Sequence, residues 1–198
     1  MSLFRKIFGP KSDDSQEHIQ NEERSKYMPD IKLPIDERFT INFKANGGKF
    51  LYCENLNEVN ENLDFILQEN EWKDKKVLLL DDRLHKKFKK FKFSTSKISE
   101  DCMFFFATCE YSISNDGSLL ISSHQIAEKK LKELPSNFII FATTSQFVET
   151  ISEGLRGIKD RNRSKIPTNI TTIKHFKACD DKDFLSYGSS SKTYICSC

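Results

Sequence analysis

A glycine, three serines and a lysine stand in a row near the carboxyl end of the chain, directly before a run that favours a β-strand. These residues are Gly188, Ser189, Ser190, Ser191 and Lys192. Glycine lets a backbone approach a ligand closely, serine hydroxyls donate and accept hydrogen bonds, and lysine adds a positive charge. The loop therefore suits an anionic ligand. It is not a P-loop, because the second glycine of that motif is absent.

A second hydroxyl-rich loop follows residues 137–142, an apolar run that predicts a buried strand. It consists of Thr143, Thr144 and Ser145, and a helix is expected from Ser145 to Ile158. Unpaired N–H groups at a helix start favour an anion, and ligands of parallel sheets bind at the carboxyl ends of strands. We therefore expect this loop and the Gly188 loop to share one small-anion site. Taken singly, each loop is also typical of an N-cap or a turn.

Two further segments are candidates for the same site. The turn that contains Asn115, Gly117 and Ser118 precedes another apolar run, although its Asp-Gly step is also a strong signal for a β-hairpin. Arg156 lies near the end of the expected helix, where two glycines let the helix stop, and its guanidinium suits a carboxylate or phosphate. The alternative is a solvated helix end, with Glu153 as the ion-pair partner of Arg156 or as an acid or base.

The cysteines and histidines show no metal-ligand spacing. Four of the six cysteines are far apart, no Cys-x-x-Cys occurs, and the histidines form no motif. We therefore expect no metal, iron–sulfur cluster or flavin cofactor. Cys196 and Cys198 are the exception, since two close thiols suit a metal or a thiol partner. They are equally typical of alternate positions on a terminal strand.

A basic run at residues 85–93 alternates lysines with phenylalanines. Such interleaving is found in proteins that bind single-stranded nucleic acid, but Phe88 and Phe91 have the helical spacing of core residues. The whole chain carries 31 basic and 29 acidic residues, a net charge of +2. This balance argues against nucleic acid or an anionic membrane as the partner.

The first part of the chain differs in character from the rest. Residues 11–27 are almost entirely polar or charged and prolines follow, so we expect residues 1–35 to be a flexible arm and residues 36–198 a single domain. A chain of 198 residues can bury one sizeable core. No apolar run is long enough for a transmembrane segment and no secretory signal is evident, so we expect a cytoplasmic protein with reduced cysteines.

Strands and helices alternate from about residue 39. The clearest helix follows Asn55, whose side chain suits an N-cap and whose following apolar residues share one face. Continuous apolar strands between helices indicate an α/β fold with a mostly parallel sheet in three α/β/α layers. The expected strands are 49–53, 77–80, 103–107, 118–122 and 137–142, and the further expected helices are 83–91 and 145–158.

Several segments together resemble the LUD (lactate-utilisation) domain family. Gly188–Ile195 is similar to the family signature Gly-Pro-Ser-Arg/Lys-Thr-Ala-Asp-Ile, with Ser189 in place of proline and Tyr194 in place of alanine. Residues 106–120 and 134–141 resemble two upstream elements of the family in the expected order. The resemblance covers about the second half of the chain and implies the NagB/RpiA/CoA-transferase-like three-layer fold.

The resemblance also implies a function. The family includes the LutC-type subunit of bacterial lactate oxidation, in which separate iron–sulfur subunits are associated with electron transfer. This chain would then be a soluble subunit or partner in oxidative L-lactate utilisation, from lactate to pyruvate, with a lactate-like carboxylate or a phosphate as ligand. Two other interpretations stay open. One is a stand-alone enzyme acting on a sugar phosphate or acyl-CoA, and the other is a non-catalytic assembly or regulatory module, including a homo-oligomer.

Overall fold

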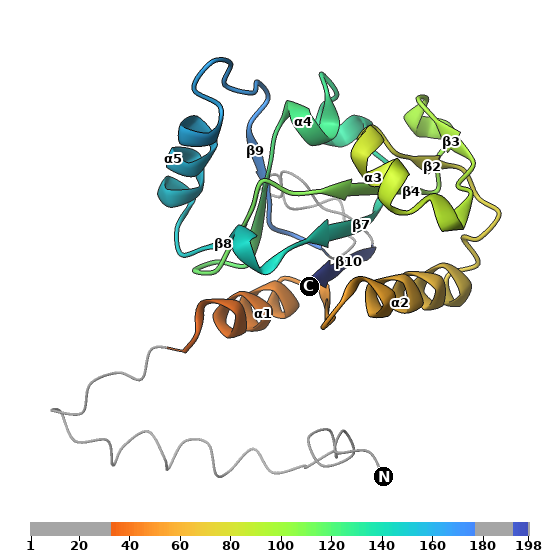
Figure 1. Cartoon of the computed structure of the whole chain (residues 1–198), viewed down its shortest axis with the longest axis horizontal. Coiled ribbons are helices and arrows are strands. Elements are labelled where there is room, and N and C mark those ends of the chain that lie inside the picture. The colour runs from red at the N-terminus through yellow and green to blue at the C-terminus, as the bar shows by residue number, and fades with distance from the viewer. Residues whose placement is uncertain (1–32, 177–191, 198) are drawn as a thin grey trace, which may run out of the picture. The chain divides into compact units, whose positions relative to one another are not determined.

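A parallel six-stranded sheet forms the centre of the part of the chain that this computed structural model describes, residues 33–176 and 192–197 (Figure 1). Its strands lie in the order β1-β10-β7-β4-β2-β3, and each neighbouring pair is parallel. The predicted α/β class with a mostly parallel sheet is thereby confirmed. The strands are β1 (Lys49–Tyr52), β2 (Val77–Leu78), β3 (Thr95–Ser96), β4 (Phe104–Thr108), β7 (Asn137–Ala142) and β10 (Lys192–Ser197).

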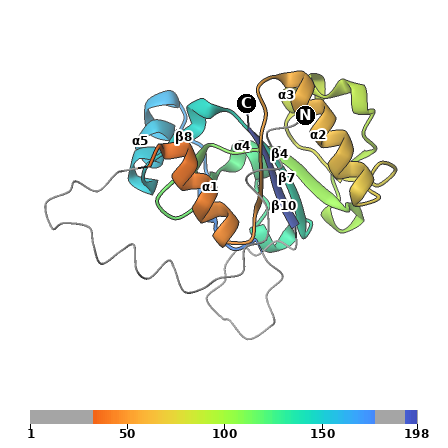
Figure 2. The same ribbon diagram turned by 90° about the horizontal axis from the view of Figure 1, so that it is seen from below.

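Side chains of the central strands alternate between two hydrophobic cores, one on each face of the sheet. In β7, Ile140 belongs to one core and Phe141 to the other, as the two-residue period of a strand requires. Figure 2 shows helices on both sides of these strands. Those on the Phe141 side are α2 (Leu56–Glu69) and α3 (Asp82–Lys87), and those on the Ile140 side are α1 (Ile35–Ala45) and α4 (Ser123–Ile126).

Helix α2 begins where the sequence predicts. The Asn55 side chain accepts hydrogen bonds from the backbone N–H groups of Asn57 and Glu58, which satisfies two donors of the first turn. The apolar face of α2, which includes Leu63 and Ile66, is buried in the core on the Phe141 side. The basic run at residues 85–93 also contributes to this core, because Phe88 is buried in it and Phe91 packs against it.

A second sheet of four strands was not expected from the sequence. Its order is β8-β5-β6-β9, and β5 and β6 form an antiparallel hairpin. Helix α5 (Ile151–Arg161) packs on this sheet through Ile158, which is buried beside Tyr111 and Leu120. The strands are β5 (Tyr111–Ile113), β6 (Ser118–Ile121), β8 (Phe147–Val148) and β9 (Thr171–Ile173).

The helix expected from residue 145 begins six residues later. Thr143 accepts no cap hydrogen bond of an α-helix but starts a short 3-10 turn, Thr144–Gln146, and β8 follows that turn. The α-helix starts at Ile151 because Thr150 and Glu153 form a capping box, in which each side chain accepts a backbone N–H of the other residue. The apolar residues at 148–158, whose spacing predicts one helix, therefore belong to strand β8 and to helix α5.

The glycines of α5 do not end the helix, as the sequence suggested, but allow it to pack closely on the second sheet. A Cβ atom at Gly154 would lie 2.9 Å from Leu120 Cδ2, and one at Gly157 would overlap the hydroxyl of Tyr111. The helix continues to Arg161 and is capped at Asn162. Gly154 and Gly157 thus set the distance between α5 and β5–β6.

The remaining short elements are 3-10 turns: Lys89–Phe91, Ser99–Asp101 and Leu131–Glu133. Within the described part of the chain, no helix has the length and apolar character needed to span a bilayer. The predicted arm falls almost wholly on residues 1–32, and the Gly188–Ser191 loop and Cys198 also lie outside the described residues.

Candidate functional site

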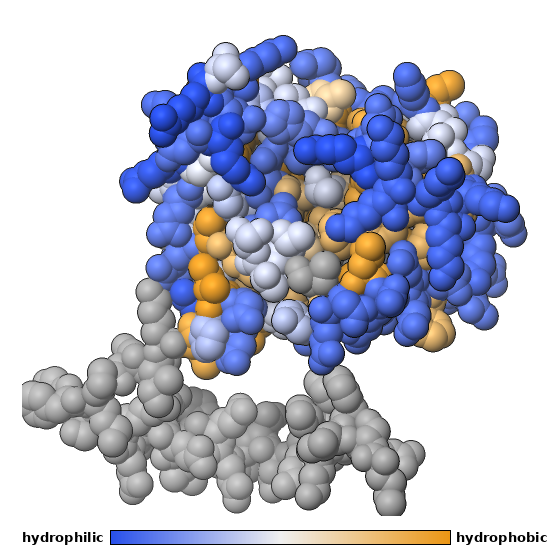
Figure 3. Space-filling view, in the orientation of Figure 1, coloured by the Kyte–Doolittle hydropathy of each residue, from blue (hydrophilic) through white to orange (hydrophobic). Residues whose placement is uncertain are grey.

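A cavity of about 370 Å³ opens at the carboxyl ends of β2, β4 and β7. This is the edge where parallel α/β sheets bind their ligands. On the face seen in Figure 3 the surface is hollowed between α3 and α5, and strongly hydrophilic side chains border the hollow. The lining residues are Asp81, Arg83, Leu84, Lys87, Thr108, Cys109, Glu110, His124, Gln125, Phe141, Thr143, Gln146, Arg161 and Asn162.

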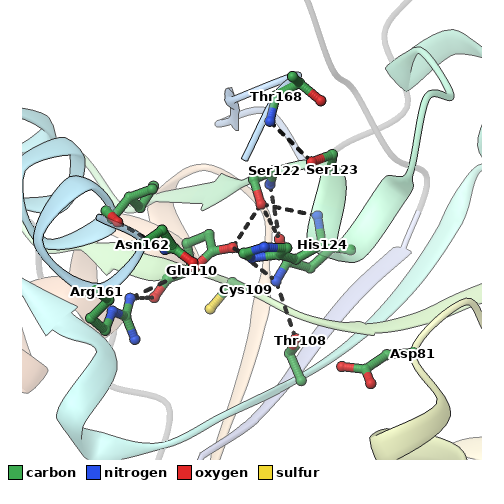
Figure 4. Close-up of polar contacts among 12 residues, drawn as sticks. Asp81, Thr108, Cys109, Glu110, Ser122, Ser123, His124, Arg161, Asn162 and Thr168 are labelled. Carbon is green, nitrogen blue, oxygen red and sulfur yellow. Dashed lines mark hydrogen bonds and ion pairs between the residues drawn. The ribbon is translucent and has the colours of Figure 1, made fainter. Parts of the chain in front are cut away.

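Glu110 is the central polar residue of this cavity, and its side chain is only 8% exposed. Its Oε1 accepts hydrogen bonds from Ser122 Oγ at 2.7 Å and from Gln125 Nε2 at 3.4 Å. Its Oε2 lies 3.7 Å from a guanidinium nitrogen of Arg161. The carboxylate therefore has hydrogen-bond donors at Oε1 and a cation beside Oε2, the kind of partners that a buried charge requires (Figure 4).

His124 also contacts Glu110, from the first turn of α4. Its Nδ1 lies 2.8 Å from Glu110 Oε1, and the His124 side chain is 43% exposed. The backbone N–H of His124 donates to the Ser122 hydroxyl, so Ser122 both caps α4 and joins it to Glu110. Glu110 thus holds the ring at Nδ1, and the His124 side chain borders the cavity.

Three cationic side chains extend around the cavity. Arg161 lies over the ring of Tyr111, with its Cζ 4.5 Å from the ring centre, and pairs with Glu110. Arg83 pairs with Asp81 at 3.1 Å. Lys87 Nζ lies 4.4 Å above the Phe141 ring, and among the described residues no carboxylate pairs with it.

Cys109 lines the cavity but does not supply a nucleophile. Burial raises the pKa of its thiol to about 12, so the sulfur is protonated at neutral pH. The backbone carbonyl of Cys109 accepts a hydrogen bond from the Gln146 side chain, whose Oε1 in turn accepts the backbone N–H of Thr143 at 2.7 Å. Cys109 and Gln146 thus join β4 to the loop that follows β7.

Asp81 caps α3 and carries a carboxylate favoured in its ionised form. Its Oδ1 accepts the backbone N–H of Arg83 at 2.8 Å, and the Arg83 side chain donates to both oxygens. Burial acts to raise the pKa of Asp81, but the hydrogen bonds and charge of Arg83 outweigh it and hold that pKa below its ordinary value of 3.8.

This lowered pKa has a consequence for stability. Ionised Asp81 stabilises the fold above the pKa of the unfolded chain, and that contribution is lost as the pH falls through the lower pKa of the folded protein. Asp81→Asn keeps an N-cap oxygen but removes the charge. We expect it to lower the free energy of unfolding in urea at about pH 7, by an amount that shrinks as the pH falls below 3.8. A difference that does not change with pH would contradict this role.

Among the predicted site residues that the structure describes, only Thr143 lines the cavity. Thr144 and Ser145 are exposed in the 3-10 turn beyond it. Arg156, expected to point inward, is exposed on α5, and the arginine of that helix that lines the cavity is Arg161. Glu153 belongs to the capping box at the start of the same helix.

The turn with Asn115, Gly117 and Ser118 is the β5–β6 hairpin and packs against α1. The Asn42 side chain donates to the backbone carbonyls of Ser114 and Asn115, and Gly117 lies against the α1 backbone. The turn lies at the opposite end of the hairpin from Glu110. Its residues therefore hold α1 and do not border the cavity.

The parallel register of β10 and β7 places the backbone of Lys192 and Thr143 at opposite ends of β7. The backbone of Lys192 pairs with Asn137 at the start of β7, whereas Thr143 follows Ala142 at the other end of that strand. Residues 188–191 and the side chain of Lys192 lie outside what the structure describes. The shared anion site and ligand binding by the Gly188–Lys192 loop itself therefore stay predictions.

No spacing rule identifies the residues that do gather at the cavity. Glu110 follows a predicted strand as an isolated acid, and His124 lies 14 residues further along the chain. The one local signal is the capping box of Ser122 and Gln125, which predicts a helix start. Within the described residues, three or more His, Cys, Asp or Glu side chains do not gather in a way that would hold a metal ion.

Comparison with known proteins gives a family and a fold. The family model described as the LUD domain matches residues 37–196. Among solved structures, a crystal structure of a DUF162 family protein from Deinococcus radiodurans is similar, with a TM-score of 0.59 and 13% identity over 84% of this chain and 99% of that one. At this identity the likeness concerns the fold. A search of curated proteins finds no significant match.

Proposed function

The chain belongs to the LUD-domain family, and from this premise we propose that it binds a small organic anion of the lactate and pyruvate class as a subunit or partner in lactate utilisation. The proposed site is the cavity at the carboxyl ends of β2, β4 and β7. The family is associated with lactate utilisation, and the residues of the cavity supply the reason for an anion.

The observation that carries the proposal is the charge of Lys87. Arg83 and Arg161 each pair with a carboxylate of the protein, whereas Lys87 is held over Phe141 without such a partner among the described residues. The cavity therefore keeps one positive charge that a ligand carboxylate or phosphate can neutralise. The hydroxyl of Thr108 lines the same cavity, accepts a hydrogen bond from Gln125 and can donate one to the anion.

A role in lactate oxidation requires a partner that accepts electrons. Conversion of lactate to pyruvate removes one hydrogen with its electron pair from the hydroxyl-bearing carbon and one proton from the hydroxyl oxygen. The family resemblance implies iron–sulfur subunits for this transfer. We propose that this chain contributes the binding of the acid and that such a partner contributes the electron transfer.

The size of the cavity favours a second candidate. About 370 Å³ falls in the usual range of small-molecule sites, and a three-carbon acid fills only part of it. A sugar phosphate or the acyl portion of acyl-CoA would fill more of it and present the same kind of charge. A larger phosphorylated ligand is therefore the alternative, with the chain acting as an enzyme in its own right.

Replacement of Lys87 tests the anion site. We expect Lys87→Met to weaken the binding of pyruvate and L-lactate by about 3- to 10-fold, because an exposed cation contributes only about 1 kcal/mol in water. Titration calorimetry on the full chain measures this directly. Lys86→Met is the matched control, since Lys86 lies on the same helix but does not line the cavity.

The same titrations separate the two candidates. Stronger binding of a sugar phosphate than of pyruvate, lost in Lys87→Met, would favour the enzyme. Equal affinity of the wild type and Lys87→Met for every anion would show that the cavity is not the binding site.

A further inference from the structure

We propose that His124, oriented by Glu110, is an acid–base residue that exchanges the carbon-bound protons beside the carbonyl of a 2-oxo acid. The inference rests on the proposed function, because the acid is the anion that the cavity binds. It adds a reaction, the reversible enolisation of that acid.

The side chains of Glu110 and His124 differ in their exposure to solvent. Glu110 is 8% exposed and His124 is 43% exposed, with 2.8 Å between Oε1 and Nδ1. The carboxylate is thus fixed inside the protein while the ring reaches the cavity that both residues line. Ring nitrogen Nε2 of His124 has no hydrogen-bond partner among the described residues.

The hydrogen bonds of Glu110 determine which nitrogen of the His124 ring carries the proton. Glu110 receives donors from Ser122 and Gln125 and an ion pair from Arg161, an environment that suits an ionised carboxylate. An ionised carboxylate only accepts, so Nδ1 of His124 carries the proton of their hydrogen bond. In the neutral ring, Nε2 then holds a lone pair and is the basic atom.

The other ionisable groups of the cavity do not suit the role of acid and base. The Cys109 thiol is buried and protonated, and Asp81 is engaged by Arg83 through both of its oxygens. Lys87 and Arg161 are cations and suit the ligand carboxylate and a developing negative oxygen. The imidazole of His124 is the group in the cavity lining that can both take and return a proton.

The reaction balances without an oxidant. His124 Nε2 takes a proton from the carbon beside the carbonyl, and the C–H electron pair forms a carbon–carbon double bond. The carbonyl π pair moves onto oxygen and gives an enolate next to the cationic side chains. The proton on Nε2 exchanges with solvent, so in D₂O a deuteron returns from Nε2 to the same carbon and the acid is otherwise unchanged.

Pyruvate in D₂O is the probe, and loss of its methyl signal in proton NMR is the measurement. We expect the full chain to accelerate the exchange over buffer, and His124→Ala to lower the rate by about 100-fold or more. Glu110→Gln should lower the maximal rate about 10-fold while the pyruvate concentration at half-maximal rate changes little. Added imidazole should restore part of the rate in His124→Ala, because it can occupy the space of the lost ring.

His85→Gln is the matched control, since His85 lies on α3 outside the cavity lining and should exchange at the wild-type rate. Wild-type exchange no faster than buffer, with pyruvate bound, overturns the inference and leaves the proposed function standing. Absence of pyruvate binding overturns both.

A separate measurement needs no variant. Nitrogen-15 NMR of the neutral His124 ring should show the proton on Nδ1, as the Glu110 contact requires. A proton on Nε2 would overturn the proposed role of Glu110.

Discussion

Gly117→Ala is expected to lower the free energy of unfolding by about 3 kcal/mol or more. Gly117 has a φ of 68°, a region that costs a residue with a Cβ about 1–2 kcal/mol. A Cβ there would also overlap the backbone of Asn42 and Phe43 in α1, so the helix must move away from the hairpin. Chemical unfolding followed by circular dichroism measures the loss.

This prediction separates two roles for the turn. If Gly117 served the anion site, as the sequence suggested, its replacement would weaken pyruvate binding in the folded protein. The structure places it against α1, so the variant that remains folded should bind pyruvate as the wild type does. Gly47→Ala is the control for backbone strain, because Gly47 has a φ of 94°. A loss at Gly117 no greater than at Gly47 would contradict the overlap with α1.

The central sheet could be predicted because its signals are local. The apolar run of β7 and the capped, amphipathic α2 each depend on neighbouring residues, and both occur where expected. Their alternation along the chain then restricts the sheet to parallel pairing. Asn55 illustrates this well, since one side chain determines where α2 starts.

The sequence predicts a strand at residues 118–122 and carries a hairpin signal at the Asp-Gly step, but the second sheet as a whole could not be predicted because its other strands are short and its contacts are distant. The two residues of β8 follow a 3-10 turn within what looks like a helical period. Tyr111, next to Glu110, gives no strand pattern of its own and pairs with Leu120 only through the hairpin. An apolar period alone cannot distinguish a strand followed by a helix from a longer helix.

The candidate site could not be predicted for the same reason. Glu110 meets Ser122 and His124 because the β5–β6 hairpin returns the chain to the same end, where the backbone N–H of Glu110 donates to Leu120. Arg161 arrives from α5, 51 residues further along the chain. The sequence predicts anion binding by a loop rich in glycine and serine, and both the anion and that loop stay predictions, whereas the described cavity is built around one buried carboxylate.

Glu110→Ala is expected to have the second large effect, a loss of about 2–4 kcal/mol in the free energy of unfolding. The replacement removes the acceptor shared by Ser122 and Gln125. It also removes the volume of a buried side chain where the cavity meets the β5–β6 hairpin. His124 and Arg161 are partly exposed, so water can solvate them and limits the cost.

The comparison with Glu110→Gln identifies the source of this loss. The glutamine side chain keeps an oxygen acceptor and nearly the same volume, so we expect it to lose less than half of what alanine loses. Glu100→Ala, an exposed acid in the turn Ser99–Asp101, should change the free energy of unfolding by less than about 0.5 kcal/mol. Urea unfolding of the three variants measures all of these values. Equal losses for alanine and glutamine would mean that the negative charge, and not the acceptor geometry, holds Ser122, Gln125 and His124 together.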